Sequence, residues 1–286
     1  MIGGLRSWLA RVVVRLWPVP YGVTRILRVI RPPPVRAAQL LTTRLRGFPL
    51  QLRFDPRGAQ GYFLYYRGVY EERLLRKLRQ LLAPGMTFVD VGANIGLYSV
   101  VAGHCVGPRG LVLAFEPQAE LAPVFWENVR MNRLSNVRHA AIALGRTAGV
   151  SSLFRVNDSP GQVSLRLRPD ERSVGPAAVV TVRTLSEALR EQGVVSVHGM
   201  KIDVEGGDLD VLEGFREWLA ATPPKFIFCE CIDRLLARFG HRSEDLIRFL
   251  RGYGYVVYYP SRTRWALLEA DAGSVTHDLL ALHTSR

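Results

Sequence analysis

The sequence predicts an α/β protein in which a mostly parallel sheet is covered by helices on both faces. Short apolar runs alternate with amphipathic segments through most of the chain, as is typical of strand–helix–strand units. Four of these runs end in an acidic residue, at Asp90, Glu116, Asp203 and Glu230. Because ligands bind beside the carboxyl ends of strands in such sheets, the sequence predicts a binding site at this edge.

Residues 1–60 form a basic extension ahead of the main domain, which we place at 61–286. The extension contains eleven arginines, no lysine and one acid, Asp55, and it accounts for most of the net charge of +13. Residues 5–16 and 23–31 each gather apolar side chains on one helical face. These helices could lie on an anionic membrane surface, or pack on the main domain with their arginines outward.

Two predicted elements lead into the central strand. Residues 50–54 alternate like a half-exposed strand, and residues 61–66 are the expected hairpin partner. Leucines between positions 74 and 82 then form one face of a helix. Glu71, at its start, could reach a bound cofactor, although an acid there more often favours a helix N-terminus.

Residues 87–96 predict a strand that feeds a tight loop and then a helix. Gly92 and Gly96 allow the backbone to turn sharply and a ligand to approach closely. The N–H groups at the helix start favour an anion such as a carboxylate. The pattern Asp-x-Gly-x-x-x-Gly lacks the glycine that lets a backbone contact a pyrophosphate, so it favours S-adenosylmethionine over NAD.

The next two strands extend this cofactor site. Glu116 lies at the carboxyl end of the run 111–115, 20 residues beyond Gly96. A carboxylate there can accept hydrogen bonds from both hydroxyls of a ribose. Residues 137–141 predict a third strand, and Ala141 could offer a small apolar wall for adenine.

The second half of the chain completes the predicted sheet. Residues 150–182 indicate an inserted hairpin and a strand. The fourth strand, 197–202, is followed by Asp203 and Glu205, and residues 226–229 form the fifth. Residues 255–259 and 265–268 predict a closing pair of strands.

Three segments, 88–96, 114–117 and 201–206, resemble the FkbM-type S-adenosylmethionine-dependent methyltransferases. The resemblance runs from about residue 70 to residue 230, and the last segment, Lys-Ile-Asp-Val-Glu-Gly, is the most specific. The family usually has a glutamate where Asp208 stands. The resemblance implies a class I methyltransferase Rossmann-like sheet of seven strands with an antiparallel last strand, and O-methylation of a sugar, glycan or small-molecule natural product.

The same resemblance assigns roles to individual residues. Glu116 would hold the ribose, and Asp203 and Glu205 would face the methyl group and the acceptor. The residues that would hold the methionine end of the donor are Asp90, Gly92, Asn94 and Gly96.

Methyl transfer to a hydroxyl requires alignment of the reacting atoms and removal of one proton. We expect one carboxylate of Asp203 and Glu205 to act as the base and the other to orient the acceptor. Two alternatives stay open. Asp203, Glu205 and Glu230 could hold a divalent ion, or Glu205 could form a structural ion pair with Lys201 or an arginine.

Other functions remain alternatives at this point: a nucleic-acid methyltransferase, or a cofactor-binding module without turnover. The near-neutral charge after residue 60 counts against the first. Three cysteines do not form a disulfide framework, so we expect a cytoplasmic protein. Membrane contact through residues 5–31 would make it peripheral, since no apolar run is long enough to span a bilayer.

Overall fold

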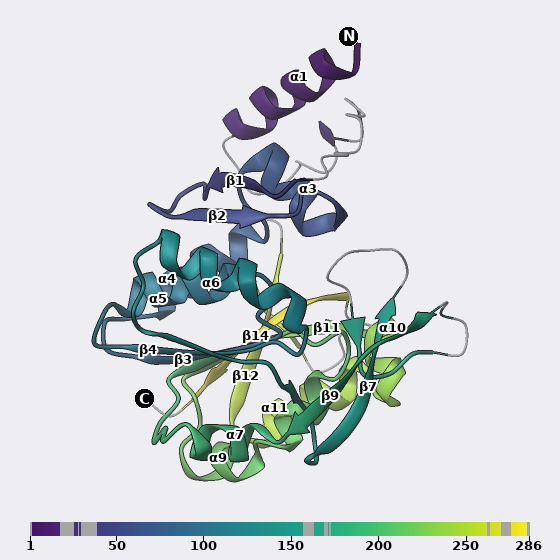
Figure 1. Cartoon of the computed structure of the whole chain (residues 1–286). Coiled ribbons are helices and arrows are strands. Elements are labelled where there is room, and N and C mark those ends of the chain that lie inside the picture. Colours follow the sequence, from purple (N-terminus) through teal and green to yellow (C-terminus); the bar gives the residue numbers. More distant parts are fainter. Residues whose placement is uncertain are drawn as a thin grey trace.

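The computed structural model describes residues 2–17, 26, 27, 29, 39–156, 163–168, 171, 173–261, 264–269 and 276–284. A central sheet carries helices on both faces, a second sheet lies beside it, and an N-terminal layer projects from one side (Figure 1). The predicted second N-terminal helix, 23–31, falls largely outside the described residues.

The central sheet has eight strands in the order β13-β12-β14-β11-β10-β3-β4-β5. Their bounds are β3 (Thr87–Val91), β4 (Leu111–Phe115), β5 (Val137–Ala140), β10 (Gly199–Ile202), β11 (Phe226–Ile232), β12 (Tyr255–Pro260), β13 (Trp265–Leu267) and β14 (Thr276–His283). Five neighbouring strands of this sheet are parallel, namely β11, β10, β3, β4 and β5. The next strand, β14, is antiparallel to β11. The predicted α/β class and class I Rossmann-like arrangement are therefore confirmed, with β13 as an added edge strand.

The expected antiparallel last strand is present as β14, but the sequence analysis did not locate its residues. The predicted closing pair exists, because β12 and β13 are antiparallel neighbours. However, β14 inserts between β12 and β11. Its residues Leu279, Leu280 and Ala281 are fully buried, and such a continuous apolar run is typical of a strand covered on both faces.

Helices cover the two faces of the sheet in separate groups (Figure 1). One group is α4 (Glu72–Leu81), α5 (Leu97–Val106) and α6 (Ala122–Met131), and the other is α7 (Leu185–Glu191), α8 (Asp208–Glu213), α9 (Arg216–Ala221) and α11 (Ser243–Gly252). Phe88 packs into the first core and Val89 into the second, because successive side chains of a strand point to opposite faces. Three further helical segments are short: the 3-10 helices η1 (Ala119–Leu121) and η2 (Ala237–Phe239), and the helix α10 (Asp233–Leu236).

The N-terminal layer consists of α1 (Ile2–Leu16), β1 (Leu41–Arg44), β2 (Gln51–Phe54) and α3 (Gly58–Arg67). The predicted pairing of β2 with residues 61–66 was wrong, because β2 pairs with β1 and residues 61–66 lie in α3. This segment contains aromatic residues that favour strands, but Tyr66 and Leu64 are buried on the helix, and burial outweighs strand propensity. The predicted domain boundary at residue 60 thus falls inside a helix.

The second sheet follows β5 in the chain. Its strands are β6 (Ala143–Leu144), β7 (Gly149–Val156), β8 (Val163–Ser164) and β9 (Ser173–Arg183), in the order β6-β9-β7-β8. Leu153, Val163 and Val180 form its own small core. The predicted inserted hairpin and strand are therefore part of a separate sheet beside the central one.

Candidate active site

A cavity of about 910 Å³ opens where the strands β3, β4 and β10 end. The loops after these strands form one wall, and residues of the second sheet and the N-terminal layer form the others. Among the predicted site residues, those that line this cavity are Glu71, Gly92, Asn94, Glu116, Asp203 and Glu205.

The loop after β3 has a backbone that depends on Gly92. This residue has φ +77°, and a Cβ atom built on it would lie 1.9 Å from the carbonyl oxygen of Asp203. A glycine is therefore required, since any side chain would push the two strand ends apart. Gly96 also has a positive φ, but it packs against the ring of Phe125 and supports the loop from behind.

Glu116 joins the two loops that face the cavity. Its Oε2 accepts a hydrogen bond from the backbone N–H of Asn94 at 2.8 Å, and its Oε1 accepts one from the N–H of Gln118 at 3.0 Å. The carboxylate is buried, and burial raises its pKa. Both oxygens lie at the carboxyl end of β4, where a ribose would meet them.

Asp90 and Ala141 are not brought to the cavity surface. The carboxylate of Asp90 is fully buried and accepts a hydrogen bond of 2.6 Å from the Ser99 hydroxyl on α5. Burial raises the pKa of this carboxyl group. Asp90 therefore fixes α5 to β3 behind the loop, while Ile142 and Ala143 line the cavity beside the exposed Ala141.

Glu71 reaches the cavity from the start of α4. Its backbone is left-handed, with φ +49°, and its Oε2 accepts a 2.6 Å hydrogen bond from the Tyr98 hydroxyl. Burial and the nearby charge of Asp203 raise the pKa of Glu71, whereas Lys201 lowers it. Tyr98, which the sequence analysis did not single out, also lines the cavity.

Lys201 is the buried cation at the centre of these acids. Its Nζ donates to Asp203 Oδ2 at 2.9 Å and lies 4.6 Å from the centre of the Tyr98 ring. Burial disfavours the ammonium charge, but Asp203, Asp90 and Glu71 together raise its pKa. The ammonium group therefore stays charged and offsets part of the negative charge around the cavity.

Glu205 is held by a second cation, Arg238. The Arg238 guanidinium donates to Glu205 Oε2 at 3.2 Å and to the Glu205 carbonyl oxygen at 3.0 Å. It also binds both carboxylate oxygens of Glu171, at 2.9 Å each. The alternative that pairs Glu205 with an arginine is thus observed, whereas Lys201 pairs with Asp203. No local sequence signal marks Arg238 or Glu171, because both lie more than 30 positions from Glu205.

Glu230 lies within β11 rather than after it, directly beside Asp278 of β14. Its Oε2 atom has no hydrogen-bond partner among the described residues. Burial, Asp203 and Asp208 raise its pKa well above the ordinary value. Over the same described part of the chain, no group of three or more acidic, histidine or cysteine side chains is arranged to hold a metal ion.

The sheet order and the loops at its carboxyl edge define a class I methyltransferase fold. The sequence profile of the methyltransferase FkbM domain matches residues 90–257, more than half of the chain. The chain belongs to this family, whose cofactor is S-adenosylmethionine. The Gly92 backbone, the buried Glu116 and the surrounding acids fit a donor that carries a ribose and a positive sulfonium.

Two curated relatives illustrate the range of the similarity. Methyltransferase sdnD of Sordaria araneosa is 33% identical over 156 residues, which cover 45% of this chain and 60% of that protein. Ribosomal RNA large subunit methyltransferase E of Acinetobacter baumannii (strain ATCC 17978) is 31% identical over 136 residues, covering 43% and 63%. The chain thus spans less than two thirds of these relatives.

Among solved structures, precorrin-6y C5,15-methyltransferase from Geobacter metallireducens GS-15 superposes with a TM-score of 0.44 and 12% sequence identity. The superposition covers 76% of this chain and 90% of that chain.

Proposed function

We propose that the chain is an S-adenosylmethionine-dependent O-methyltransferase that acts on a hydroxyl of a sugar, glycan or small-molecule natural product. The observation that carries this proposal is the shared cavity of Gly92, Glu116 and Asp203. The Asp203 backbone lies directly against Gly92, so the carboxylate stands beside the loop that would hold the methionine end of the donor.

The donor supplies a methyl group that its sulfonium already activates. The protein must then align an acceptor oxygen with the methyl carbon and remove the hydroxyl proton as the new C–O bond forms. We assign proton removal to Asp203, because it stands beside the donor loop and its side chain is the more exposed carboxylate of the pair. Glu205, which Arg238 holds in place, would orient the acceptor hydroxyl.

A nucleic-acid acceptor is less well supported by the cavity. A polyanionic acceptor requires cations that are free to bind phosphates. Of the three arginines among the described residues that line the cavity, Arg57 is neutralised by Asp55 and Arg146 by Asp210, and the third, Arg166, stacks over the Phe239 ring. This pairing favours an acceptor with little negative charge.

Donor binding is tested first, by calorimetric titration with S-adenosylhomocysteine. We expect binding to the native chain, with Kd raised about 10- to 100-fold in Glu116→Gln, because a hydrogen bond to a charged group contributes about 1.5–3 kcal/mol. The control is Glu269→Gln on the exposed surface. A chain that binds NAD but neither donor form would contradict the proposal.

Transfer is tested with radiolabelled methyl donor and a panel of glycolipids, oligosaccharides and hydroxylated natural products. Asp203→Asn should abolish turnover and leave S-adenosylhomocysteine binding intact, and Glu205→Gln should mainly raise KM for the acceptor. Full activity in Asp203→Asn would refute the assigned base. Donor binding without transfer to any hydroxyl compound would favour a binding module, and label in RNA would favour a nucleic-acid enzyme.

A further inference from the structure

Helix α1 presents its apolar face to solvent. Leu5, Trp8, Leu9, Val13 and Leu16 have exposed fractions between 39% and 75%. Positions 5, 8, 9, 13 and 16 recur at helical spacing, so these side chains form one continuous strip, which we call the α1 apolar strip. An exposed apolar surface of this kind marks a binding site for another apolar surface.

Arg11 and Arg15 of α1 are exposed but reach neighbouring groups of the N-terminal layer. The Arg11 guanidinium stacks over the Tyr65 ring at 4.9 Å from its centre. Arg15 donates to the Thr43 hydroxyl at 3.2 Å and to the Tyr65 carbonyl oxygen at 3.4 Å. The helix packs on the domain through Ala10 and Val14, which are fully buried against Tyr66, and the exposed Arg11 and Arg15 border this contact.

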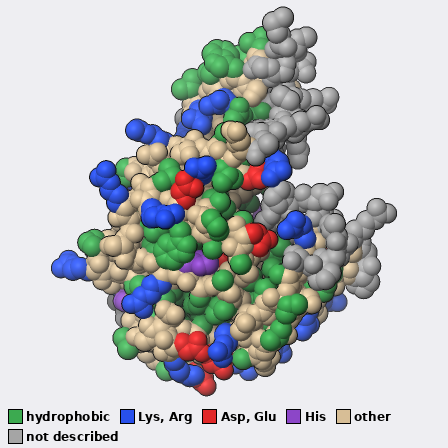
Figure 2. Space-filling model, viewed as in Figure 1, with side chains coloured by type: hydrophobic (Ala, Val, Ile, Leu, Met, Phe, Trp, Pro, Cys, Tyr) green, Lys and Arg blue, Asp and Glu red, His purple; other side chains and the backbone are tan. Residues whose placement is uncertain are grey.

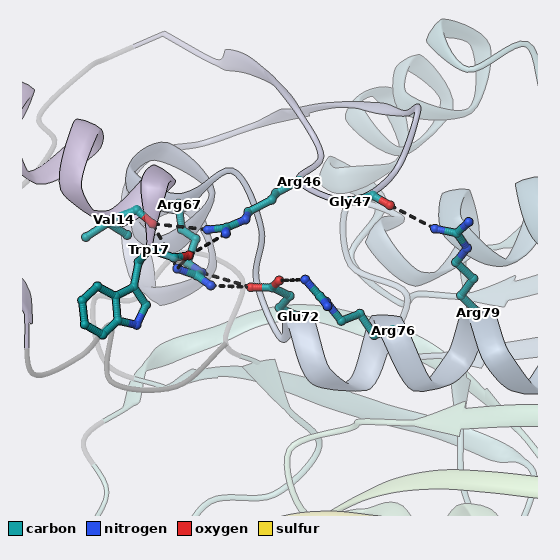
Figure 3. A network of polar contacts seen from close by, with 8 residues as sticks. All are labelled: Val14, Trp17, Arg46, Gly47, Arg67, Glu72, Arg76 and Arg79. Carbon is teal, nitrogen blue, oxygen red and sulfur yellow. Dashed lines mark hydrogen bonds and ion pairs between the residues drawn. The ribbon is translucent and has the colours of Figure 1, made fainter. Parts of the chain in front are cut away.

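The orientation of α1 is fixed by a buried polar network at its C-terminal end (Figure 3). Arg46 and Arg67 donate to the carbonyl oxygens of Val14 and Trp17. Arg67 is also bound by both its Nε and Nη2 atoms to Glu72 of α4. Cations at a helix C-terminus are favourable, and the side chains of Arg67 and Glu72 are almost completely buried. The α1 apolar strip is thus held outward by the fold.

The surroundings of the strip are basic. In Figure 2, hydrophobic side chains cover the projecting upper end of the molecule, with Lys and Arg side chains directly beneath them. Arg11, Arg15 and Arg44 are exposed on the described part of this layer. The only acid in residues 1–60, Asp55, is paired with Arg57. An apolar helix face bordered by arginines matches the boundary between the acyl chains and headgroups of an anionic bilayer.

We propose that α1 docks this protein on an anionic lipid bilayer, with the α1 apolar strip in the interface and the arginines among the headgroups. Trp8 suits this depth because its indole ring is largely apolar and carries one polar N–H group at its edge. A second copy of the chain fits less well, because a two-fold contact through α1 would bring two arginine-rich layers together. Leu40 and Gln60 of the same layer line the cavity, so docking would hold the cavity close to the membrane.

The test is flotation of the full chain with vesicles of phosphatidylcholine, with or without about one third phosphatidylglycerol. We expect binding to the anionic vesicles, weaker binding to the neutral ones, and loss at high salt. Trp8→Ser/Leu9→Ser should lower binding about tenfold or more, since each side chain loses apolar contact with the bilayer. Both residues are exposed, so an unchanged melting temperature is expected and is measured alongside.

The matched control is Val195→Ser/Leu267→Ser, which changes two exposed apolar residues of the main domain and should leave flotation unchanged. Trp8→Phe should remove the blue shift of tryptophan fluorescence that anionic vesicles cause. Equal flotation of the α1 variant and the native chain would overturn the proposal. So would a chain that ignores vesicles but forms a dimer that the α1 variant abolishes.

Discussion

The two sides of the cavity, to which we assign the donor and the acceptor, are held together by different forces. On the donor side, backbone groups fix the structure. Gly92 allows the loop to turn, and the N–H of Asn94 donates a hydrogen bond to Glu116. On the acceptor side, side-chain ion pairs hold Asp203 through Lys201 and Glu205 through Arg238. A local requirement leaves a glycine, or the nearby Lys201, in the sequence, whereas the ion pair between Glu205 and the distant Arg238 leaves no local mark.

The largest loss of stability is expected from Gly92→Ala, on the donor side of the cavity. The new Cβ would lie 1.9 Å from the Asp203 carbonyl oxygen, and the residue would also keep a φ of +77°. We expect a loss of about 4 kcal/mol or more in the free energy of unfolding, from overpacking and backbone strain combined. Urea denaturation measures this loss.

The control for this variant is Gly240→Ala. Its backbone is left-handed, with φ +80° and ψ 18°, but a Cβ atom there would meet nothing within 4 Å. It should therefore lose only about 1 kcal/mol, from the left-handed backbone alone. Equal losses for the two variants would show that contact with Asp203 does not constrain the loop.

On the acceptor side, Arg238→Gln removes the ion pairs that hold Glu205 and Glu171. This change leaves Glu171 and Glu205 without their buried cation, which costs about 3–5 kcal/mol of stability at neutral pH. Binding of S-adenosylhomocysteine should change less than about threefold, because within the described residues Arg238 bonds to Glu171 and Glu205 and not to the loop after β3. Urea denaturation and calorimetry together measure both effects.

The pH dependence of this loss follows from Glu171. Its hydrogen bonds to Arg238 lower its pKa, so its contribution is present above its unfolded pKa and disappears as the pH falls through the folded value. The difference between the native chain and Arg238→Gln should therefore shrink below about pH 4. The control Arg190→Gln removes an exposed ion pair with Glu217 and should cost less than about 1 kcal/mol. A strong loss of donor binding in Arg238→Gln would show that the two sides are coupled.

The smallest expected effect is a gain of stability in Glu230→Gln. Burial raises the pKa of Glu230, so its stability contribution is complete below the unfolded pKa and is lost as the pH rises through the folded value. At pH 8 the neutral glutamine should stabilise the protein by about 1–2 kcal/mol, and this gain should vanish near pH 4. Thermal melts across this range provide the measurement, with the exposed Glu269→Gln as the matched control. Destabilisation at pH 8 would mean that Glu230 has a stabilising partner.

Much of the sheet could be predicted because its parallel strands are short apolar runs, and four of them have an acidic residue at or near the carboxyl end. β14 was not located, since it follows the apparent end of the pattern and its pairing depends on β11, more than 40 positions earlier. The helix α3 was mistaken for a strand because its aromatic residues favour strands in isolation. Its burial under α1 decides otherwise, and such burial cannot be deduced from neighbouring residues.

The residues alone predicted the α/β class, the glycine loop after β3 and the acids near the carboxyl ends of the strands. Each of these depends on residues that are close in the chain, where spacing and residue type fix the backbone. The three-dimensional packing places Asp90 behind the loop, Arg238 against Glu205, and the α1 apolar strip on the outside. These features depend on which distant side chains share a buried space, and a linear pattern does not contain that information.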